Sequence, residues 1–150
     1  MSTGTGTGTP ASSSVSGDYI TQSDIEDFFG EDNVAKWSQL DNDTDAADTN
    51  RIQSGIDWAE RKVNARFSGS KYVTPFSTSS VDKQLIRWMA TFAGIWIYEG
   101  RGQQDDSEEG NKYSKLKQDT ENEMSICIAS ATERLSATVV STCPTSAQVV

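Results

Sequence analysis

The chain contains no histidine, and this absence removes several kinds of chemistry at once. Histidine is the side chain that titrates near neutral pH, so it serves as the usual general base and as the commonest metal ligand. No GxSxG element, phosphate-binding loop or pair of zinc-ligand motifs takes its place. The sequence therefore predicts a protein that is not an enzyme and that has no catalytic residue, no metal site and no cofactor.

Basic residues are scarce as well. The 150 residues include 13 Lys and Arg against 22 Asp and Glu, and the formal net charge is −9. Charge-driven binding of nucleic acid needs Lys and Arg to neutralise phosphates and release counterions. The composition therefore argues against a protein that binds DNA or RNA through its overall charge.

Cysteines and long apolar stretches are the remaining shortages. Cys127 and Cys143 are too far apart for a CxxC motif, and the first residues lack the charged and apolar regions of a signal peptide. We therefore expect the chain to be made and kept in a reducing cytoplasm. The longest apolar stretch, residues 88–98, is about half of the ~20 residues that a transmembrane helix needs, so no membrane association is expected.

Composition divides the chain into three parts. Residues 1–17 are almost entirely Ser, Thr and Gly, which bury too little apolar surface to offset the entropy of ordering them. We expect these residues to be a flexible arm. Residues 18–135 have the composition of one globular domain, and residues 136–150 return to Ser, Thr and Val. We expect the last segment to be a docking tail.

Apolar periodicity and turn residues predict a mainly α fold for the domain. Three long helices are expected at about residues 48–67, 81–99 and 111–135, and one or two short helices at about 23–29 and 32–40. These elements would form a small helical bundle with flexible N- and C-terminal arms. An extended loop or short strand over residues Lys71 to Phe76 should precede the second long helix, because Pro75 disfavours helix at Thr74.

Several local signals support these helices. Ser23 and Glu26 form a capping-box pattern at the first short helix, and Leu40 continues an apolar stripe in the second. The helix over residues 81–99 is apolar around nearly half of its circumference, which predicts a central position. Its Trp88 and Trp96, and Cys127 on the last helix, are interpreted as core residues.

An acidic loop at residues 41–48 invites a test for calcium binding. Asp41, Asp43 and Asp45 follow the opening rhythm of a calcium loop. The match then fails, because Ala46 occupies the position of the invariant Gly and Ile52 the position of the bidentate Glu. We interpret the segment as a solvated loop whose last residue, Asp48 or Thr49, caps the next helix.

Charge is distributed unevenly along the chain. Residues 18–50 carry ten acids and one base, whereas residues 51–76 carry two acids and five bases. Surfaces of opposite sign suit head-to-tail contact between copies, although solvated helix faces would explain the same pattern. The candidate inter-subunit residues are Arg51, Arg61, Lys62, Arg66, Tyr72 and Phe76.

The order of these features resembles a known family of phage proteins. The resemblance covers residues 19–135 and depends on order and spacing rather than on one motif. It rests on residues 19–21, 24–25 and 28–30, an Asp-rich loop leading to Asp48 and Ile52, a helix with Ile56, Ala59, Val63, Asn64 and Arg66, the segment 71–76, a helix ending near Tyr98, and a last helix with Tyr113. Taken together these positions resemble the small neck proteins of Mu-like phages. The arm before Asp18 and the tail after Leu135 are longer than the family leads us to expect.

The resemblance implies a head–tail connector, or adaptor, in the neck of the virion. Such a protein is assembled in the host cytoplasm as a ring that contacts itself, the portal protein and the next neck or tail protein. A ring of about twelve copies would match the portal and close by rotation. DNA would pass through its channel without sequence-specific binding. The alternatives are a soluble helical module that binds a partner with its Trp-rich helix and, less favoured, a tail-terminator-type neck component.

The tail provides the candidate partner-docking residues. They are β-prone and carry no charge, which suits strand addition to an exposed edge on the portal or on an adjacent subunit. A tail folded back on its own domain is the alternative. The residues are Ala137, Thr138, Val139, Val140, Val149 and Val150.

Overall fold

The computed structural model describes residues 14–40, 46–102 and 107–130 and the single positions 134, 135, 137 and 139. Within these residues the chain forms five α-helices and no named strand. They are α1 (Gln22–Phe29), α2 (Glu31–Ser38), α3 (Thr49–Phe67), α4 (Lys83–Glu99) and α5 (Glu108–Ala129). The mainly α fold with three long and two short helices is confirmed.

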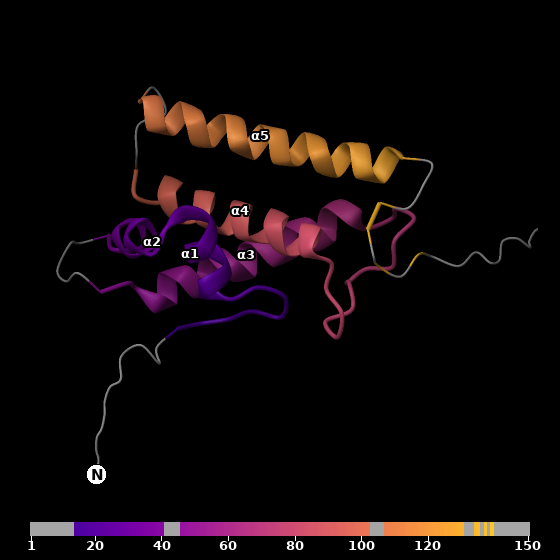
Figure 1. Cartoon of the computed structure of the whole chain (residues 1–150), viewed down its shortest axis with the longest axis horizontal. Helices are drawn as coiled ribbons and strands as arrows, with labels where there is room; N and C mark the ends of the chain where they lie inside the picture. Colours follow the sequence, from indigo (N-terminus) through magenta and orange to yellow (C-terminus); the bar gives the residue numbers. More distant parts are fainter. Residues whose placement is uncertain are drawn as a thin grey trace, which may run out of the picture.

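The three long helices run alternately up and down, and α4 lies between α3 and α5 (Figure 1). The short helices α1 and α2 pack against the end of α4 that leads to α5. The central position predicted for the helix over residues 81–99 is confirmed, because α4 buries eleven of its residues. No helix in the described part of the chain is both long and apolar enough to cross a bilayer.

The start of α1 differs from the prediction. Thr21, rather than Ser23, is the N-cap: its hydroxyl accepts a hydrogen bond from the Asp24 N–H, and the Asp24 carboxylate accepts one from the Thr21 N–H. Both pairs have the capping-box spacing. The earlier pair forms the cap, and Ile20 just before it is fully buried.

The second short helix also begins and ends earlier than predicted. Gly30 has a φ of +98°, a conformation that other residues rarely adopt, and it joins α1 directly to α2. Val34 and Trp37 are buried as expected. Leu40 is 57 % exposed, so the prediction that it continues this apolar stripe is wrong. Because α2 ends at Ser38, Leu40 lies past the last helical turn.

The long helices begin at side-chain caps. Asp48 caps α3 by accepting a hydrogen bond from the Arg51 N–H, as the sequence suggested, and Asp82 caps α4. Ser107 caps α5, so this helix starts three residues before the predicted residue 111. It ends at Ala129 rather than at residue 135, and Ser130 has an extended backbone conformation. Residues 41–45 lie outside the described residues, so the calcium question stays a prediction.

Two aromatic clusters hold the ends of the bundle together. Phe29, Trp37, Tyr98 and Tyr113 join α1, α2, α4 and α5, with ring centroids 4.8–5.8 Å apart. At the other end Phe67 contacts three rings, those of Tyr72, Phe76 and Trp88. Aromatic pairs of this kind stabilise a core beyond their buried area. The second cluster also positions the pocket described below.

Candidate interaction site

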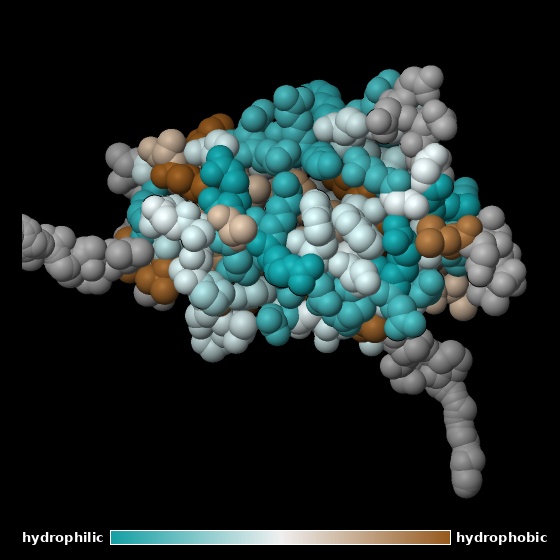
Figure 2. Space-filling view, turned by 180° about the vertical axis from the view of Figure 1, so that it is seen from behind, coloured by the Kyte–Doolittle hydropathy of each residue, from teal (hydrophilic) through white to brown (hydrophobic). Residues whose placement is uncertain are grey.

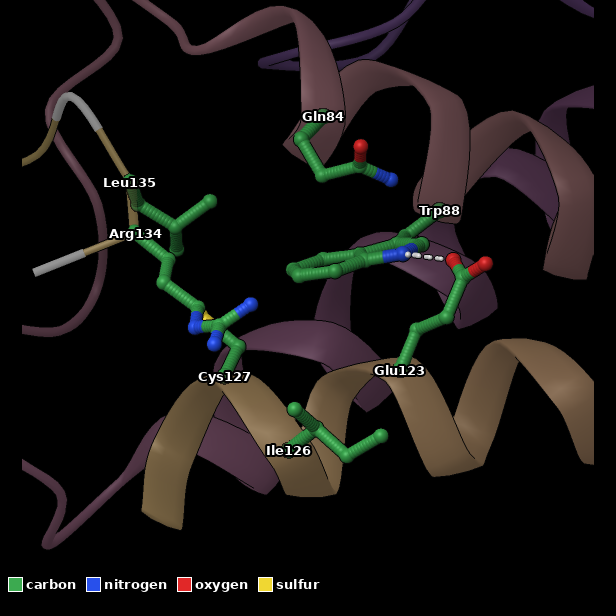
Figure 3. Close-up of a pocket in the computed structure, with 7 residues that line it drawn as sticks. All are labelled: Gln84, Trp88, Glu123, Ile126, Cys127, Arg134 and Leu135. Atoms are coloured by element: carbon green, nitrogen blue, oxygen red, sulfur yellow. Dashed lines mark hydrogen bonds between the residues drawn. The ribbon is translucent and has the colours of Figure 1, made fainter. Parts of the chain in front are cut away.

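A pocket opens where α4, α5 and the segment after α5 meet (Figure 3). Its volume is ≈ 480 Å³, which is within the range of sites that hold a small ligand or a short peptide segment. Each of the three elements contributes part of the lining. The lining residues are Gln84, Trp88, Glu123, Ile126, Cys127, Arg134 and Leu135.

Trp88 forms the floor of this pocket. Its side chain is 3 % exposed, and its ring stacks on Phe67 of α3 with centroids 5.7 Å apart. The indole Nε1–H donates a hydrogen bond to Glu123 Oε1 on α5 at 3.0 Å (Figure 3). A buried indole N–H needs such an acceptor. The bond therefore fixes the spacing of α4 and α5 at the pocket.

Tyr72 holds the segment that closes the pocket. Its hydroxyl accepts hydrogen bonds from the main-chain N–H groups of Arg134, at 3.0 Å, and Leu135, at 3.3 Å. The same oxygen lies 3.8 Å from Cys127 Sγ. Burial raises the pKa of Tyr72 above its usual value of 10.0, so the phenol is neutral at neutral pH.

Lys71 fixes the end of α5 nearby. Its ammonium donates hydrogen bonds to the carbonyl oxygens of Cys127, at 3.1 Å, and Ser130, at 2.5 Å. The last carbonyl groups of a helix have no partner within the helix, and a cation is favoured there by the helix dipole. Lys71 and Tyr72 are adjacent in sequence, so one short extended segment orders both α5 and the residues after it.

The rim of the pocket is polar and has a charge at each end. The guanidinium of Arg134 lies on one side of the Trp88 ring and the carboxylate of Glu123 on the other (Figure 3). Gln84 lies over the ring, and its Nε2 is buried without a hydrogen-bond partner in the described part of the chain. Ile126 is apolar and 57 % exposed. The site can thus bind a group that combines apolar surface with hydrogen-bond acceptors.

A second polar site binds the N-terminal segment rather than a ligand. The carboxylate of Glu60 on α3 accepts hydrogen bonds from the main-chain N–H groups of Asp18, Tyr19 and Ile20, at 3.0, 2.7 and 3.0 Å. The Tyr19 hydroxyl donates to the Phe76 carbonyl at 2.6 Å. A Cβ on Gly17 would lie 2.5 Å from both Glu60 oxygens, so this close approach requires glycine. We call Glu60 and these three N–H groups the N-terminal clamp.

The segment just before the N-terminal clamp also belongs to the folded domain. Val15 and Gly17, which we expected in the arm, are half-buried, and Ser16 pairs with Thr21 in an isolated β-bridge. Residues 14–17 therefore contact the helical domain. Residues 1–13 lie outside the described residues, and the flexibility expected for them stays a prediction.

The basic residues singled out on α3 bind within their own chain. Arg51 stacks on the Trp96 ring, with its guanidinium carbon 4.4 Å from the ring centroid. Lys62 forms an ion pair with Glu121 of α5 at 3.5 Å. Arg66 donates a hydrogen bond to Ser125 of α5 at 2.6 Å. The first contact attaches α3 to α4 and the other two attach α3 to α5, which sequence patterning did not indicate.

The other candidate inter-subunit residues fall into two groups. Arg61 is exposed, whereas Tyr72 and Phe76 are 1 % and 4 % exposed and belong to the core of this chain. An interface at this place would therefore use the surface around the two rings and not the rings themselves. Local sequence patterns could not indicate this burial, because Tyr72 and Phe76 lie in a loop segment, where burial depends on distant helices.

The described residues of the tail contact their own domain. Val139 forms an isolated antiparallel bridge with Tyr72, and Ala137 is half-buried. Thr138, Val140, Val149 and Val150 lie outside the described residues, so docking by them stays a prediction. The described part of the chain contains no cluster of three or more Cys, Asp or Glu side chains that could hold a metal ion.

The pocket residues Gln84, Glu123 and Arg134 were not identified from the sequence. Gln84 and Trp88 are four residues apart on α4, and this spacing places them on one helix face. Nothing in the sequence links them to Glu123, because the link is a hydrogen bond between helices.

Fold and site together define a small helical-bundle protein with a pocket between its last two helices. The sequence model of the family described as Bacteriophage Mu, Gp36 matches residues 19–142. This match covers most of the chain, and the chain belongs to that family. It is a Mu-like phage protein, and the family indicates a structural, virion-related role. No curated protein and no solved structure matches it significantly.

Proposed function

We propose that this protein is a non-enzymatic head–tail connector that forms a homo-oligomeric ring in the neck of the virion. The ring would be assembled in the host cytoplasm, bind the portal protein with a matching copy number, extend the DNA channel and offer a platform to the next neck or tail protein. The observation that carries the proposal is the family match over residues 19–142.

The surface charges support contact between copies. Exposed acids lie on α1 and α2, at Asp27, Glu31 and Asp32, while α3 exposes Arg61 and Arg66. A ring is built by heterologous contacts, in which one patch of each copy meets a different patch of the next. Opposite charges on the two patches would guide and orient that contact.

The overall charge is compatible with a DNA channel. The chain carries a net charge of −9, and the face in Figure 2 is largely hydrophilic with scattered apolar residues. A channel wall of this kind repels phosphates instead of binding them, so DNA can slide through it.

The structure gives less support to a helical module that binds a partner with its Trp-rich helix. Trp88 is 3 % exposed, and the ring of Trp96 is covered by Arg51. Both tryptophan rings of α4 are therefore largely taken up by contacts within the chain. The pocket beside Trp88 fits a contact made within an assembly.

The proposal is tested by measuring the mass of the assembly. Purified full-length chain is mixed with the portal protein of its phage and examined by mass photometry and negative-stain microscopy. We expect closed rings on one end of the portal, with masses that rise in steps of the 16.3 kDa subunit. A chain that stays monomeric and does not bind the portal at micromolar concentration would contradict the proposal.

A further inference from the structure

The pocket between α4 and α5 contains a buried polar group that needs a partner. Gln84 Nε2 is buried and has no hydrogen-bond acceptor in the described part of the chain. A buried donor without an acceptor destabilises a fold, so an occupant that brings a carbonyl oxygen would be favoured. Ile126 is 57 % exposed at the rim and adds apolar surface. The pocket therefore suits a short polypeptide segment with apolar side chains.

The charges of the lining favour an uncharged segment. The guanidinium of Arg134 and the carboxylate of Glu123 lie on opposite sides of the Trp88 ring (Figure 3). Glu123 already accepts the hydrogen bond of the Trp88 indole. A charged occupant would be attracted by one of the two groups and repelled by the other.

The chain itself leaves the described residues beside this pocket. Arg134 and Leu135 line the pocket and donate their main-chain N–H groups to the Tyr72 hydroxyl. Val139 is bridged to the main chain of the same tyrosine. Little more than the length of one tyrosine side chain therefore separates the anchor at Val139 from the pocket wall.

The residues after Val139 have a composition that allows the chain to turn back. Residues 140–146 read VSTCPTS, and Ser, Thr and Pro favour turns. Fully extended, these seven residues would span about 23 Å at roughly 3.3 Å per residue, so they can form a turn and still return to the pocket. Residues 147–149, which follow, are Ala, Gln and Val and carry no charge.

We propose that residues 147–149 fold back and occupy the pocket of their own subunit. A main-chain carbonyl of this segment accepts the hydrogen bond of Gln84 Nε2, and Val149 packs against Ile126. The chain's own segment is favoured over that of another copy, because a short tether gives it an effective concentration in the roughly millimolar range.

The inference describes the free subunit and stands independently of the proposed ring. In an assembly, a neighbouring protein that contacts residues 147–149 or the pocket would have to displace this segment. The contact adds little to the free energy of unfolding, because the entropy lost in ordering the tail offsets most of the new contacts. Proximity therefore tests it better than a melting temperature does.

Disulfide formation measures that proximity. Cys127 lines the pocket, and the chain has one other cysteine, Cys143, in the expected turn. The double variant Cys143→Ser/Val149→Cys moves the second thiol into the proposed occupant, and the natural chain is its matched control. Both are oxidised with diamide at low micromolar concentration, and intramolecular disulfide is quantified by non-reducing electrophoresis and mass spectrometry. We expect the variant to form it about tenfold faster, which corresponds to 1.4 kcal/mol.

A tail that does not bind the pocket gives the opposite order. The loop from Cys127 to Cys143 is shorter than the loop from Cys127 to residue 149, so it closes slightly more readily in a free chain. Equal rates or a faster natural chain would overturn the proposal. Disulfides that form mainly between copies would overturn the assignment to the same subunit.

Two pocket variants in the background of the double variant test the chemistry. Gln84→Ala removes the buried donor and Ile126→Ser removes the apolar contact, and each should slow the disulfide about fivefold, the effect of losing one contact. Lys83→Ala, an exposed neighbour of Gln84 outside the pocket, is the control and should leave the rate unchanged. Circular dichroism verifies that each variant is folded. An unchanged rate in both pocket variants would overturn the placement of the segment in this pocket.

Discussion

At the scale of single residues, a few buried polar groups join segments that lie far apart in the chain. Glu60 is 6 % exposed and accepts three main-chain hydrogen bonds from the segment before α1. The Tyr72 hydroxyl accepts two main-chain hydrogen bonds from the segment after α5. Hydrogen bonds of this kind are worth most when their loss leaves a buried partner unsatisfied. Both ends of the domain therefore depend on one side chain each.

Glu60→Gln tests the N-terminal clamp. The substitution keeps the size of the side chain, but it removes the charge and turns an NH₂ group toward N–H donors, so we expect a loss of about 2–4 kcal/mol in the free energy of unfolding. A urea titration measures it. The control is Asp57→Asn on the exposed face of the same helix, which should cost less than about 0.5 kcal/mol. Equal losses for the two variants would show that the clamp contributes little.

Titration of Tyr72 should lower the free energy of unfolding at alkaline pH. Because burial raises its pKa in the folded state above 10.0, the folded chain holds the phenolic proton more tightly than the unfolded chain. The contribution of Tyr72 is therefore complete below about pH 10 and is lost as the pH rises through the folded pKa. Urea titrations between pH 8 and pH 11.5 should show this decline. It should be smaller in Tyr72→Phe, and an equal decline in both proteins would contradict the prediction.

At the scale of the helices, α4 organises the bundle because each of the other four helices packs directly against it. Its close contacts require small residues at particular positions. A Cβ on Gly94 would lie 2.2 Å from the ring of Phe29 on α1. Glycine within a helix is normally unfavourable, and here it permits the close approach of two helices.

Gly94→Ala should reverse the usual effect of this substitution. In an exposed helix the change stabilises by about 1 kcal/mol, but here the clash with Phe29 should destabilise by about 1–3 kcal/mol. Thermal unfolding, with chemical denaturation as a cross-check, shows whether the substitution raises or lowers the stability of the fold. In a Phe29→Leu background the penalty should shrink, because a smaller side chain leaves room for the methyl group. A stabilising Gly94→Ala would show that α1 and α4 do not pack this closely.

The two tryptophans of α4 should differ in their contributions. Trp88 is 3 % exposed and stacks on Phe67, whereas Trp96 is only partly buried and packs under Arg51. Trp88→Ala should cost about 3–5 kcal/mol, and Trp96→Ala should cost clearly less. Urea titrations of the two variants give the comparison. The reverse order would mean that the core is centred at the other end of α4.

At the scale of the whole molecule, a rigid bundle is joined to a C-terminal tail whose first part folds back on the domain. Leu135 is 5 % exposed and Val139 pairs with Tyr72, so the residues up to 139 belong to the folded chain. Truncation experiments on assembly must therefore start beyond this point. Contacts of the residues beyond 139 with other copies or with the portal stay a prediction, because those residues lie outside the described ones.

Deleting residues 141–150 should separate folding from assembly. We expect the truncated chain to keep its melting temperature, because it retains the bridge at Val139 and the hydrogen bonds to Tyr72. It should lose ring formation, because the tail would supply a contact between copies. Differential scanning fluorimetry and mass photometry measure the two properties. A large fall in the melting temperature would place the tail in the core of the subunit.

The sequence by itself determined the helical class, the order of the helices and the family. Apolar periodicity and capping residues act over a few residues, so they are readable locally, as at Asp48 and along residues 81–99. Only the tertiary structure decided the pocket, the N-terminal clamp and the burial of Tyr72 and Phe76. These features join residues about 35 to 63 positions apart, and local patterns carry no information about such pairs.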